Sequence, residues 1–398
     1  MSFLASVQLA PRDPILGLTE QYNADPNPAK VNLGVGVYFD ANGKLPLLKC
    51  VEQAEKLMAE TLKPRGYLPI DGIAAYDNAV KTLVFGADSA ILSHGRVATV
   101  QALGGTGGLK VGADFLRMLT PESKVLISDP SWENHRALFS HAGFLVQNYP
   151  YYDAASRGID FKGMLGALQS AAAGSVVVLH ACCHNPTGCD LSSEQWDQVL
   201  DLVKSRRLIG FLDMAYQGFG AGLAEDGAVI GKFVAAGIDF LVSTSFSKSF
   251  SLYGERVGAL SVVGRDDEES ARVLSQLKIY IRSNYSTPPT HGATIVSTVL
   301  GTPLLRALWE DELAAMRVRI KEMRQAFVEK LRAAGVKQDM SFITRQAGMF
   351  SYSGLSREQM IRLRSEFGVY GTDTGRMCVA ALNHNNIDYV CASIAKVL

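Results

Sequence analysis

The stretch STSFSKSFSLYGERVG, residues 243–258, places two basic residues just after an apolar run. The run, DFLVSTSF (239–246), is rich in apolar and β-branched residues and predicts a buried strand. Lys248 follows the strand at once, and Arg256 comes eight residues later. A loop lysine usually keeps its ammonium in water, so Lys248 alone indicates nothing about chemistry. What matters is whether other loops that follow strands carry functional groups of their own.

Several short apolar runs alternate with stretches of helical periodicity, such as residues 192–205. The runs that predict strands are 97–103, 124–128, 175–180, 208–215, 240–246 and 258–264. Continuous apolar strands separated by helices predict an α/β fold, with a mostly parallel sheet that helices cover on both faces. Ligands of such sheets bind beyond the carboxyl ends of the strands, so the loops there are the places to search.

The sequence changes in character from about residue 306. A long charged amphipathic helix comes first, and short strand-like pieces (348–354 and 376–382) and a further helix (356–368) follow. This pattern predicts a second, smaller α+β domain that the N-terminal segment completes. We therefore expect a large domain over residues 40–305 and a discontinuous small domain formed by residues 1–39 and 306–398.

Composition excludes several classes of partner. The 398 residues include 39 basic and 39 acidic side chains, so the net charge is zero, whereas nucleic-acid and membrane-surface binders need a basic excess. The N-terminus lacks the pattern of a secretion signal, and no apolar stretch is long enough to span a bilayer. Six sparse cysteines do not form the framework of a secreted protein. We expect a cytoplasmic protein without nucleic-acid or membrane partners.

Two of the loops after strands are rich in glycine or proline. QALGGTGGLKVGADFL (101–116) reads as a strand, a glycine turn and a helix whose free N–H groups could hold a phosphate. It lacks the G-x-G-x-x-G order of a dinucleotide site, which weakens the dehydrogenase alternative. LHACCHNPTGCD (179–190) invites a zinc interpretation, but adjacent cysteines chelate one tetrahedral ion poorly and we expect no metal. Its useful feature is the amide of Asn185, before a proline that is a candidate for a cis peptide.

Two further loops carry an acid and aromatic groups. Asp213 ends an apolar strand in FLDMAYQGFG (211–220), where a carboxylate is costly unless it meets a cation, and Tyr216 follows it. SDPSWENH (128–135) adds Trp132 and His135. Each residue alone has an ordinary structural explanation. Together the four loops offer a phosphate cradle, an amide, a buried acid with a phenol, and an amine followed by an arginine, which is the set that pyridoxal phosphate requires.

With these motifs the chain resembles, along nearly its whole length, the class I aminotransferases of pyridoxal-phosphate fold type I. The resemblance is to the aspartate and aromatic amino acid aminotransferases, and closest to the aromatic (tyrosine) branch. The matching stretches are NLGVGVY (32–38), GYLPIDG (66–72), GGTG (104–107), SWENH, HNPTG (184–188), DMAYQGF, SFSKSFSLYGERVG, IRSNYSTPP (281–289), GMFSYSG and TGRMCVA. HNPTG with SFSK and ERVG at these separations is highly specific.

The resemblance implies a role for each matching residue. Lys248 corresponds to the lysine that forms the Schiff base and shuttles the proton, and Asp213 to the acid on the ring nitrogen, with His135 orienting it. Tyr216 and Asn185 would donate to the ring oxygen. Trp132 would stack on the ring. The residues expected to hold the phosphate are Gly105, Thr106, Ser245 and Arg256, together with Tyr67, which would reach it from the neighbouring subunit.

The resemblance also implies how substrates bind. Arg376 would grip the substrate α-carboxylate, as a planar fork can. Arg282 would reach a side-chain carboxylate from the second subunit, so we expect a homodimer with shared active sites. The substrate would also contact Gly36, Trp132 and Asn185. YGTDTGR (370–376) departs from the family pattern, and its Asp373 could alter the loop or compete for Arg376.

The expected activity is ping-pong transfer of the amino group of tyrosine and phenylalanine, and also of aspartate and glutamate, to 2-oxoglutarate. Local features such as SWENH and SLYGERVG favour the aromatic branch over the alternative, an aspartate aminotransferase with strict dicarboxylate preference. A decarboxylase or lyase on this fold would release product without an oxo-acid acceptor. A non-catalytic binding protein would be expected to have lost some of Lys248, Asp213 or Arg376, and all three are present.

Overall fold

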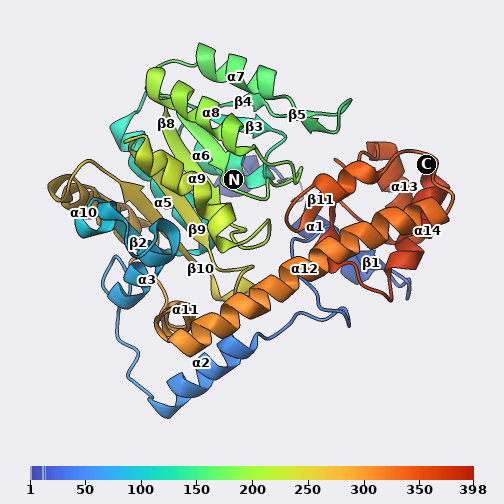
Figure 1. The fold of residues 1–398 in the computed structure, drawn as a ribbon, viewed down its shortest axis with the longest axis horizontal. Helices are drawn as coiled ribbons and strands as arrows, with labels where there is room; N and C mark the ends of the chain where they lie inside the picture. Colours follow the sequence, from blue (N-terminus) through green and yellow to red (C-terminus); the bar gives the residue numbers. More distant parts are fainter. Residues whose placement is uncertain (1, 11–12, 14) are drawn as a thin grey trace.

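The computed structural model describes residues 2–10, 13 and 15–398. Its centre is a seven-stranded sheet of strand order β2-β10-β9-β8-β7-β3-β4 (Figure 1). The strands are β2 (Val97–Leu103), β3 (Lys124–Asp129), β4 (Leu145–Pro150), β7 (Val176–His180), β8 (Ile209–Met214), β9 (Phe240–Ser245) and β10 (Val257–Val263). Only β10 runs antiparallel to its neighbours in this sheet, so the expected mostly parallel sheet is confirmed.

Both faces of the sheet are buried, as continuous apolar strands require. In β7, Val176 and Val178 belong to one apolar cluster, whereas Val177 and Leu179 belong to the other. The first cluster includes side chains of α5 (Gly104–Leu119), α6 (Glu133–His141) and α10 (Asp267–Asn284). The second includes those of α3 (Ala74–Phe85), α7 (Phe161–Ser170), α8 (Ser193–Ser205), α9 (Leu223–Ala235) and α11 (His291–Gly301).

One strand of the sheet, β4, was not predicted. Its sequence, LVQNYP, contains polar residues, and only Val146 and Tyr149 of its six residues are buried. The strand lies at an edge of the sheet, where it pairs with β3 alone, so it needs no continuous apolar run.

The second lobe is formed by chain segments from both ends of the sequence (Figure 1). The N-terminal strand β1 (Val31–Asn32) pairs with β12 (Val369–Tyr370), and β11 (Phe350–Tyr352) pairs with β13 (Arg376–Cys378). The helices of this region are α1 (Leu16–Ala24), α13 (Arg357–Phe367) and α14 (Ile387–Val397). The division at residues 40 and 305 stays a prediction.

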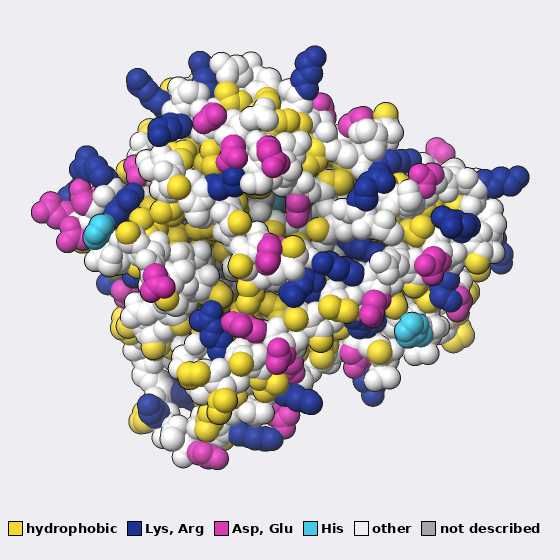
Figure 2. All heavy atoms as spheres, in the orientation of Figure 1, with side chains coloured by type: hydrophobic (Ala, Val, Ile, Leu, Met, Phe, Trp, Pro, Cys, Tyr) yellow, Lys and Arg dark blue, Asp and Glu magenta, His cyan; other side chains and the backbone are white. Residues whose placement is uncertain are grey.

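The long helix α12 (Pro303–Ala333) connects the two lobes. It packs on α2 (Lys49–Glu60) and α11 at one end and on α14 at the other. Figure 2 shows acidic and basic side chains interspersed over the visible face of the molecule. Among the described residues, no helix combines the length and the apolarity that a membrane crossing needs.

Candidate active site

A cavity of about 360 Å³ lies at the carboxyl ends of β7, β8 and β9, where ligands of parallel sheets bind. The beginning of α5 and several segments of the second lobe also contribute to its lining. Eleven residues that the sequence singled out line this cavity: Gly36, Gly105, Thr106, Trp132, Asn185, Asp213, Tyr216, Ser245, Lys248, Arg256 and Arg376. The fold therefore gathers side chains that lie up to 340 positions apart, from Gly36 to Arg376, around one space.

Lys248 lies three residues past the end of β9, with its side chain directed into the cavity. Its Nζ atom is 4.8 Å from the centre of the Tyr216 ring. Burial lowers the pKa of Lys248 to about 8, because the ammonium loses water; Asp213 opposes this shift, and Arg256 and Arg376 add to it. An amine with this pKa is partly neutral near pH 7 and can act as a nucleophile or a base.

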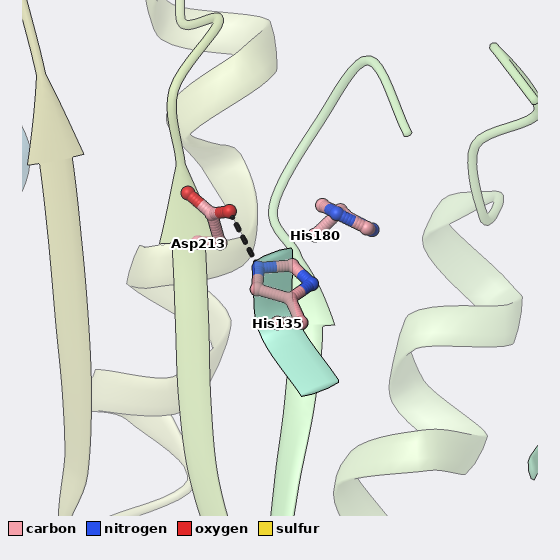
Figure 3. A group of neighbouring side chains, drawn as sticks. All are labelled: His135, His180 and Asp213. Atoms are coloured by element: carbon pink, nitrogen blue, oxygen red, sulfur yellow. Dashed lines mark hydrogen bonds and ion pairs between the residues drawn. The ribbon is translucent and has the colours of Figure 1, made fainter. Parts of the chain in front are cut away.

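Asp213 ends β8 and meets a histidine that comes from the beginning of α6 (Figure 3). His135 Nε2 lies 2.9 Å from Asp213 Oδ2, and His135 Nδ1 lies 2.9 Å from Ser131 Oγ. An ionised carboxylate only accepts hydrogen bonds, so Nε2 carries the proton and Nδ1 accepts from Ser131. Burial alone would raise the pKa of Asp213, but the hydrogen bond from His135 and the positive charge of Lys248 lower it below its ordinary value.

A second histidine accompanies this pair. His180, at the end of β7, is the register partner of Asp213 in the parallel sheet, and its ring lies 5.0 Å from that of His135. Burial lowers the pKa of His180 to about 3, so its ring stays neutral. Figure 3 shows His135 between Asp213 and His180.

The amino end of α5 forms an anion cradle beside Arg256. Gly104 has a positive φ of 68°, and a Cβ atom there would lie 2.5 Å from Arg256 Nη2, so only glycine fits. Arg256 Nη1 donates to Tyr253 O at 2.9 Å and to Ser247 Oγ at 3.3 Å. The first N–H groups of a helix lack intrahelical acceptors, and a nearby guanidinium adds charge. The cradle suits a phosphate group.

Arg376 is the second anion-binding group, from β13 in the second lobe. It is 1% exposed; its Nη1 donates to Asn185 Oδ1 at 3.0 Å and its Nη2 to Gly34 O at 2.7 Å. The guanidinium also lies 4.3 Å from the centre of the Phe350 ring. Its buried Nε–H has no acceptor in the described part of the chain. A buried arginine with a free donor in a cavity is suited to a carboxylate ligand.

The departure before Arg376 does not disturb that arginine. Asp373 Oδ1 accepts from Arg364 Nη1 at 3.0 Å, and Asp373 Oδ2 lies 3.5 Å from Arg357 Nε. The only carboxylate recorded as an ion-pair partner of Arg376 within the described residues is Glu133, at 4.0 Å. The possibility that Asp373 competes for Arg376 is therefore not realised in this structure.

Two expected site residues lie away from the cavity of their own chain. Tyr67 is 96% exposed and does not line the cavity. Arg282, near the end of α10, is exposed and donates to Ser286 Oγ. One chain therefore does not bring them to the site, and their roles stay a prediction that concerns a second subunit.

Sequence reasoning missed several residues of the lining: Ile15, Leu16, Val35, Val37, Leu109, His180, Ala215, Ser247, Tyr253 and Phe350. His180 ends a predicted strand next to that of Asp213, so its position was available as a signal. Ser247 and Tyr253 lie within residues 243–258, the stretch that also contains Lys248 and Arg256. The apolar residues carry no chemical signal, and only the fold places Leu16 and Val35 beside Arg376 in the lining.

Two groups of potential metal ligands are engaged with other partners. His135 and Asp213 hydrogen bond to each other, and they form the first group with His180. The second group consists of Cys182, Cys183 and Asp226, and Asp226 accepts hydrogen bonds from three backbone N–H groups. The hydrogen bond between the two cysteines, and then burial, raise the pKa of Cys182 well above its ordinary value. Protonated thiols are poor metal ligands, and the expectation that the protein binds no metal stays a prediction.

Residues 28–394 match the family described as aminotransferase class I and II. The chain is 60% identical over 398 residues to an aspartate aminotransferase of Pseudomonas aeruginosa, with both chains fully covered. It is 51% identical over 387 residues to the aromatic-amino-acid aminotransferase of Escherichia coli, covering 97% of this chain and 98% of that one. The aromatic-amino-acid aminotransferase of Burkholderia pseudomallei, solved covalently bound to pyridoxal phosphate, superposes with a TM-score of 0.97 at 62% identity, and both chains are fully covered.

The cavity fits the cofactor seen in the Burkholderia structure. The α5 cradle, where the backbone of Gly104 lies so close to the Arg256 guanidinium that a Cβ atom would collide with it, suits the phosphate. Asp213, ionised and buried, suits a protonated ring nitrogen, and the low-pKa amine of Lys248 suits an aldehyde. The chain belongs to the class I and II aminotransferases and is a pyridoxal-phosphate-dependent transaminase, whose substrates are amino acids and 2-oxo acids.

Proposed function

We propose that this transaminase moves the amino group of tyrosine and phenylalanine, and also of aspartate and glutamate, to 2-oxoglutarate. The observation that carries the aromatic part is an apolar wall on the same cavity as Arg376: Ile15, Leu16, Val35 and Val37. Leu16 is 62% exposed although it borders the cavity, so a substrate ring could cover it. Relatives at 60% and 51% identity carry the names of aspartate and aromatic-amino-acid aminotransferases.

Arg376 and Asn185 would position every substrate in the same way. The free Nε–H of Arg376 and its outer N–H groups would hold the α-carboxylate, and the hydrogen bond to Asn185 fixes the plane of the guanidinium. Gly36 borders the same space. A Cβ atom there would lie 2.7 Å from Phe350 Cζ, so glycine allows this segment to pack closely against the Phe350 ring. Trp132 lines the same cavity and would contact the substrate as well.

Bound pyridoxal phosphate supplies an aldehyde carbon and an electron-poor ring that can accept the electrons of a broken C–H bond. Asp213 would hold a proton on the ring nitrogen, and the His135 hydrogen bond keeps that carboxylate ionised and oriented. Lys248, as a neutral amine, would remove the proton from the substrate Cα atom and, as the resulting ammonium, would deliver it to the carbon that comes from the cofactor aldehyde.

The remaining cofactor contacts follow from the same geometry. Asn185 Oδ1 is occupied by Arg376, so its amide N–H groups are available to the ring oxygen, and Tyr216 O–H would donate there too. Trp132 would stack on the ring. The phosphate would be held by Gly105, Thr106, Ser245 and Arg256, all of which line the cradle side of the cavity.

We also propose that the working unit is a homodimer. Tyr67 is 96% exposed and Arg282 is exposed as well, on one chain. A second copy would place them at its own cavity, Tyr67 on the phosphate and Arg282 on a side-chain carboxylate. When the substrate is aromatic, Arg282 would swing away and leave the apolar wall to the ring.

The cell compartment belongs to the same proposal. All six cysteines are free thiols, five of them buried, which suits a reducing cytoplasm.

The test compares purified enzyme acting on phenylalanine, tyrosine and aspartate, each with 2-oxoglutarate. We expect kcat/KM values for the aromatic substrates within about tenfold of that for aspartate, because Arg376 serves all three. An aspartate value higher by orders of magnitude would establish the alternative, a strict aspartate aminotransferase, which the name of the Pseudomonas relative favours. Product formation without an oxo acid would instead indicate a lyase.

A further inference from the structure

A second pocket, of about 320 Å³, lies between α3 and α10 beside the edge strand β2. Residues of the 69–72 segment close one end of it, and Asp267 lies at another. It shares no lining residue with the active-site cavity. Its volume is at the small end of the range for sites that hold small organic molecules.

Two buried polar groups on facing helices of this pocket have no partner. Asp77 on α3 is 7% exposed, and Ser270 on α10 is 6% exposed. Neither Asp77 Oδ1 nor Ser270 Oγ makes a hydrogen bond with any described residue. An unpaired buried polar group costs about 1–3 kcal/mol, so two on one pocket indicate a missing partner.

The charged groups around Asp77 do not supply that partner. Asp71 already pairs with Lys278 at 3.0 Å, and Lys81 lines the pocket but does not hydrogen bond to Asp77 Oδ1. Asp267 adds a second acid to the lining. Burial, and then Asp71, raise the pKa of Asp77 to about 8, which Lys81 and Lys278 only partly oppose. The pocket thus holds a buried acid whose Oδ1 atom has no hydrogen-bond partner among the described residues.

We propose that this pocket is a second ligand site, which takes a small molecule with a primary ammonium group held by Asp77 and Ser270. An ammonium has three N–H donors, so it can serve the carboxylate and the hydroxyl oxygen at once. Val97, Ala271 and Leu274 give the pocket apolar surface that suits a short carbon chain. A bare ion would leave most of the space unfilled.

Butylamine is the probe, titrated by calorimetry into holoenzyme whose cofactor has first been reduced onto the protein with borohydride, so that the amine cannot react with the aldehyde. We expect saturable binding at one site per chain, and none with 1-butanol, which has the same shape without the charge. Since the amine should bind the ionised acid, the association constant should rise about tenfold from pH 6 to pH 7, with release of a proton.

Variants assign the binding to the pocket. Asp77→Asn should weaken butylamine binding at least about tenfold, because the neutral amide keeps the shape but loses the charge. Ser270→Ala should weaken it a few-fold. Asp388→Asn is the matched control, since Asp388 is a surface acid paired with Lys330, and it should bind as the parent does.

Binding of butylamine that does not saturate would overturn the proposal, and so would equal binding by the Asp77→Asn variant and the parent. A third contrary result would be that potassium chloride displaces butylamine at a concentration as low as a second amine needs. We expect the Asp77→Asn variant to catalyse transamination as the parent does. If butylamine does not bind, the proposed substrate range is therefore unaffected.

Discussion

Asp213 and Asp77 are two aspartates with nearly equal burial and opposite acidity. They are 6% and 7% exposed, yet the pKa of Asp213 is lowered while that of Asp77 is raised to about 8. Burial raises both, and the difference comes from partners. Asp213 receives a hydrogen bond from His135 and faces Lys248, whereas Asp77 has another acid, Asp71, as its strongest charged neighbour. Burial of an acid therefore indicates function only when its partners are known.

The positions of the two acids in the fold explain the difference. Asp213 ends a central strand, where the neighbouring strand and α6 bring His180 and His135 around it. Asp77 lies in the first turn of α3 above an edge strand, and that helix faces α10 across an open pocket. Central strand ends collect side chains from many loops, and a sheet edge collects few.

The largest expected effect comes from removing the cation that faces Asp213. Lys248→Ala should lower transamination at least about 10⁴-fold, because both the nucleophile and the proton carrier are lost. The variant should still hold the cofactor non-covalently, which absorbance of the purified protein measures. Lys232→Ala, which removes a surface lysine paired with Asp197, is the control and should match the parent. Turnover near the parent's rate would remove Lys248 from the mechanism.

Isosteric replacement of the two acids tests the comparison directly. Asp213→Asn should lower kcat about 10³-fold, or about 4 kcal/mol, since an amide cannot hold the ring nitrogen protonated. Asp77→Asn, the matched substitution at equal burial, should change kcat less than about twofold. The measurement is steady-state turnover with aspartate and phenylalanine. Equal losses in the two variants would show that burial of the acid, and not its partner, sets its importance.

Removal of the partner should move Asp213 toward the behaviour of Asp77. His135→Phe keeps a buried ring but removes the hydrogen bond that lowers the Asp213 pKa, so that pKa should rise. Activity should then fall about tenfold at pH 8 and further at pH 6, as the acid limb of the kcat profile shifts upward. His291→Phe, at a half-buried histidine that pairs with Glu55, serves as the control. An unshifted acid limb would mean that His135 only fills space.

Much of the fold was predictable because the central strands carry continuous apolar runs and the helices between them are amphipathic. The edge strand β4 was not, because half-exposed strands need no such run. Within the site, Lys248, Asp213 and Asn185 were predictable because polar groups directly after apolar strands stand out. Leu16 and Val35 were not, since an apolar residue beside a cavity has the same sequence signature as one in a core. The pocket at Asp77 was not predictable either, because its other wall is α10, which lies almost 200 residues away in the sequence.

A smaller effect concerns stability rather than activity. Between the ordinary pKa of 3.8 and the folded value of about 8, the folded protein holds a proton on Asp77 that the unfolded chain has lost. The free energy of unfolding should therefore fall as pH rises through this window, by at most about 1.4 kcal/mol per pH unit from this group. Asp77→Asn removes the term, so the variant should gain stability over the parent toward pH 8 in urea unfolding. Parallel pH profiles of parent and variant would show that Asp77 titrates normally.

The smallest expected effect is that of Asp373→Asn, at an acid that is close to Arg376 in sequence but not in contacts. Asp373 pairs with Arg364 and Arg357, and its side chain is 40% exposed. Because water screens such pairs, their loss should lower the free energy of unfolding by at most about 1 kcal/mol. Arg376 keeps its bonds to Asn185 and Gly34, and KM for aspartate and phenylalanine should therefore change less than about twofold. A several-fold drop in both KM values would show that Asp373 does draw on the Arg376 guanidinium. In that case an exposed acid would matter more to the site than the buried Asp77, because only a charge that reaches a binding group can alter substrate affinity.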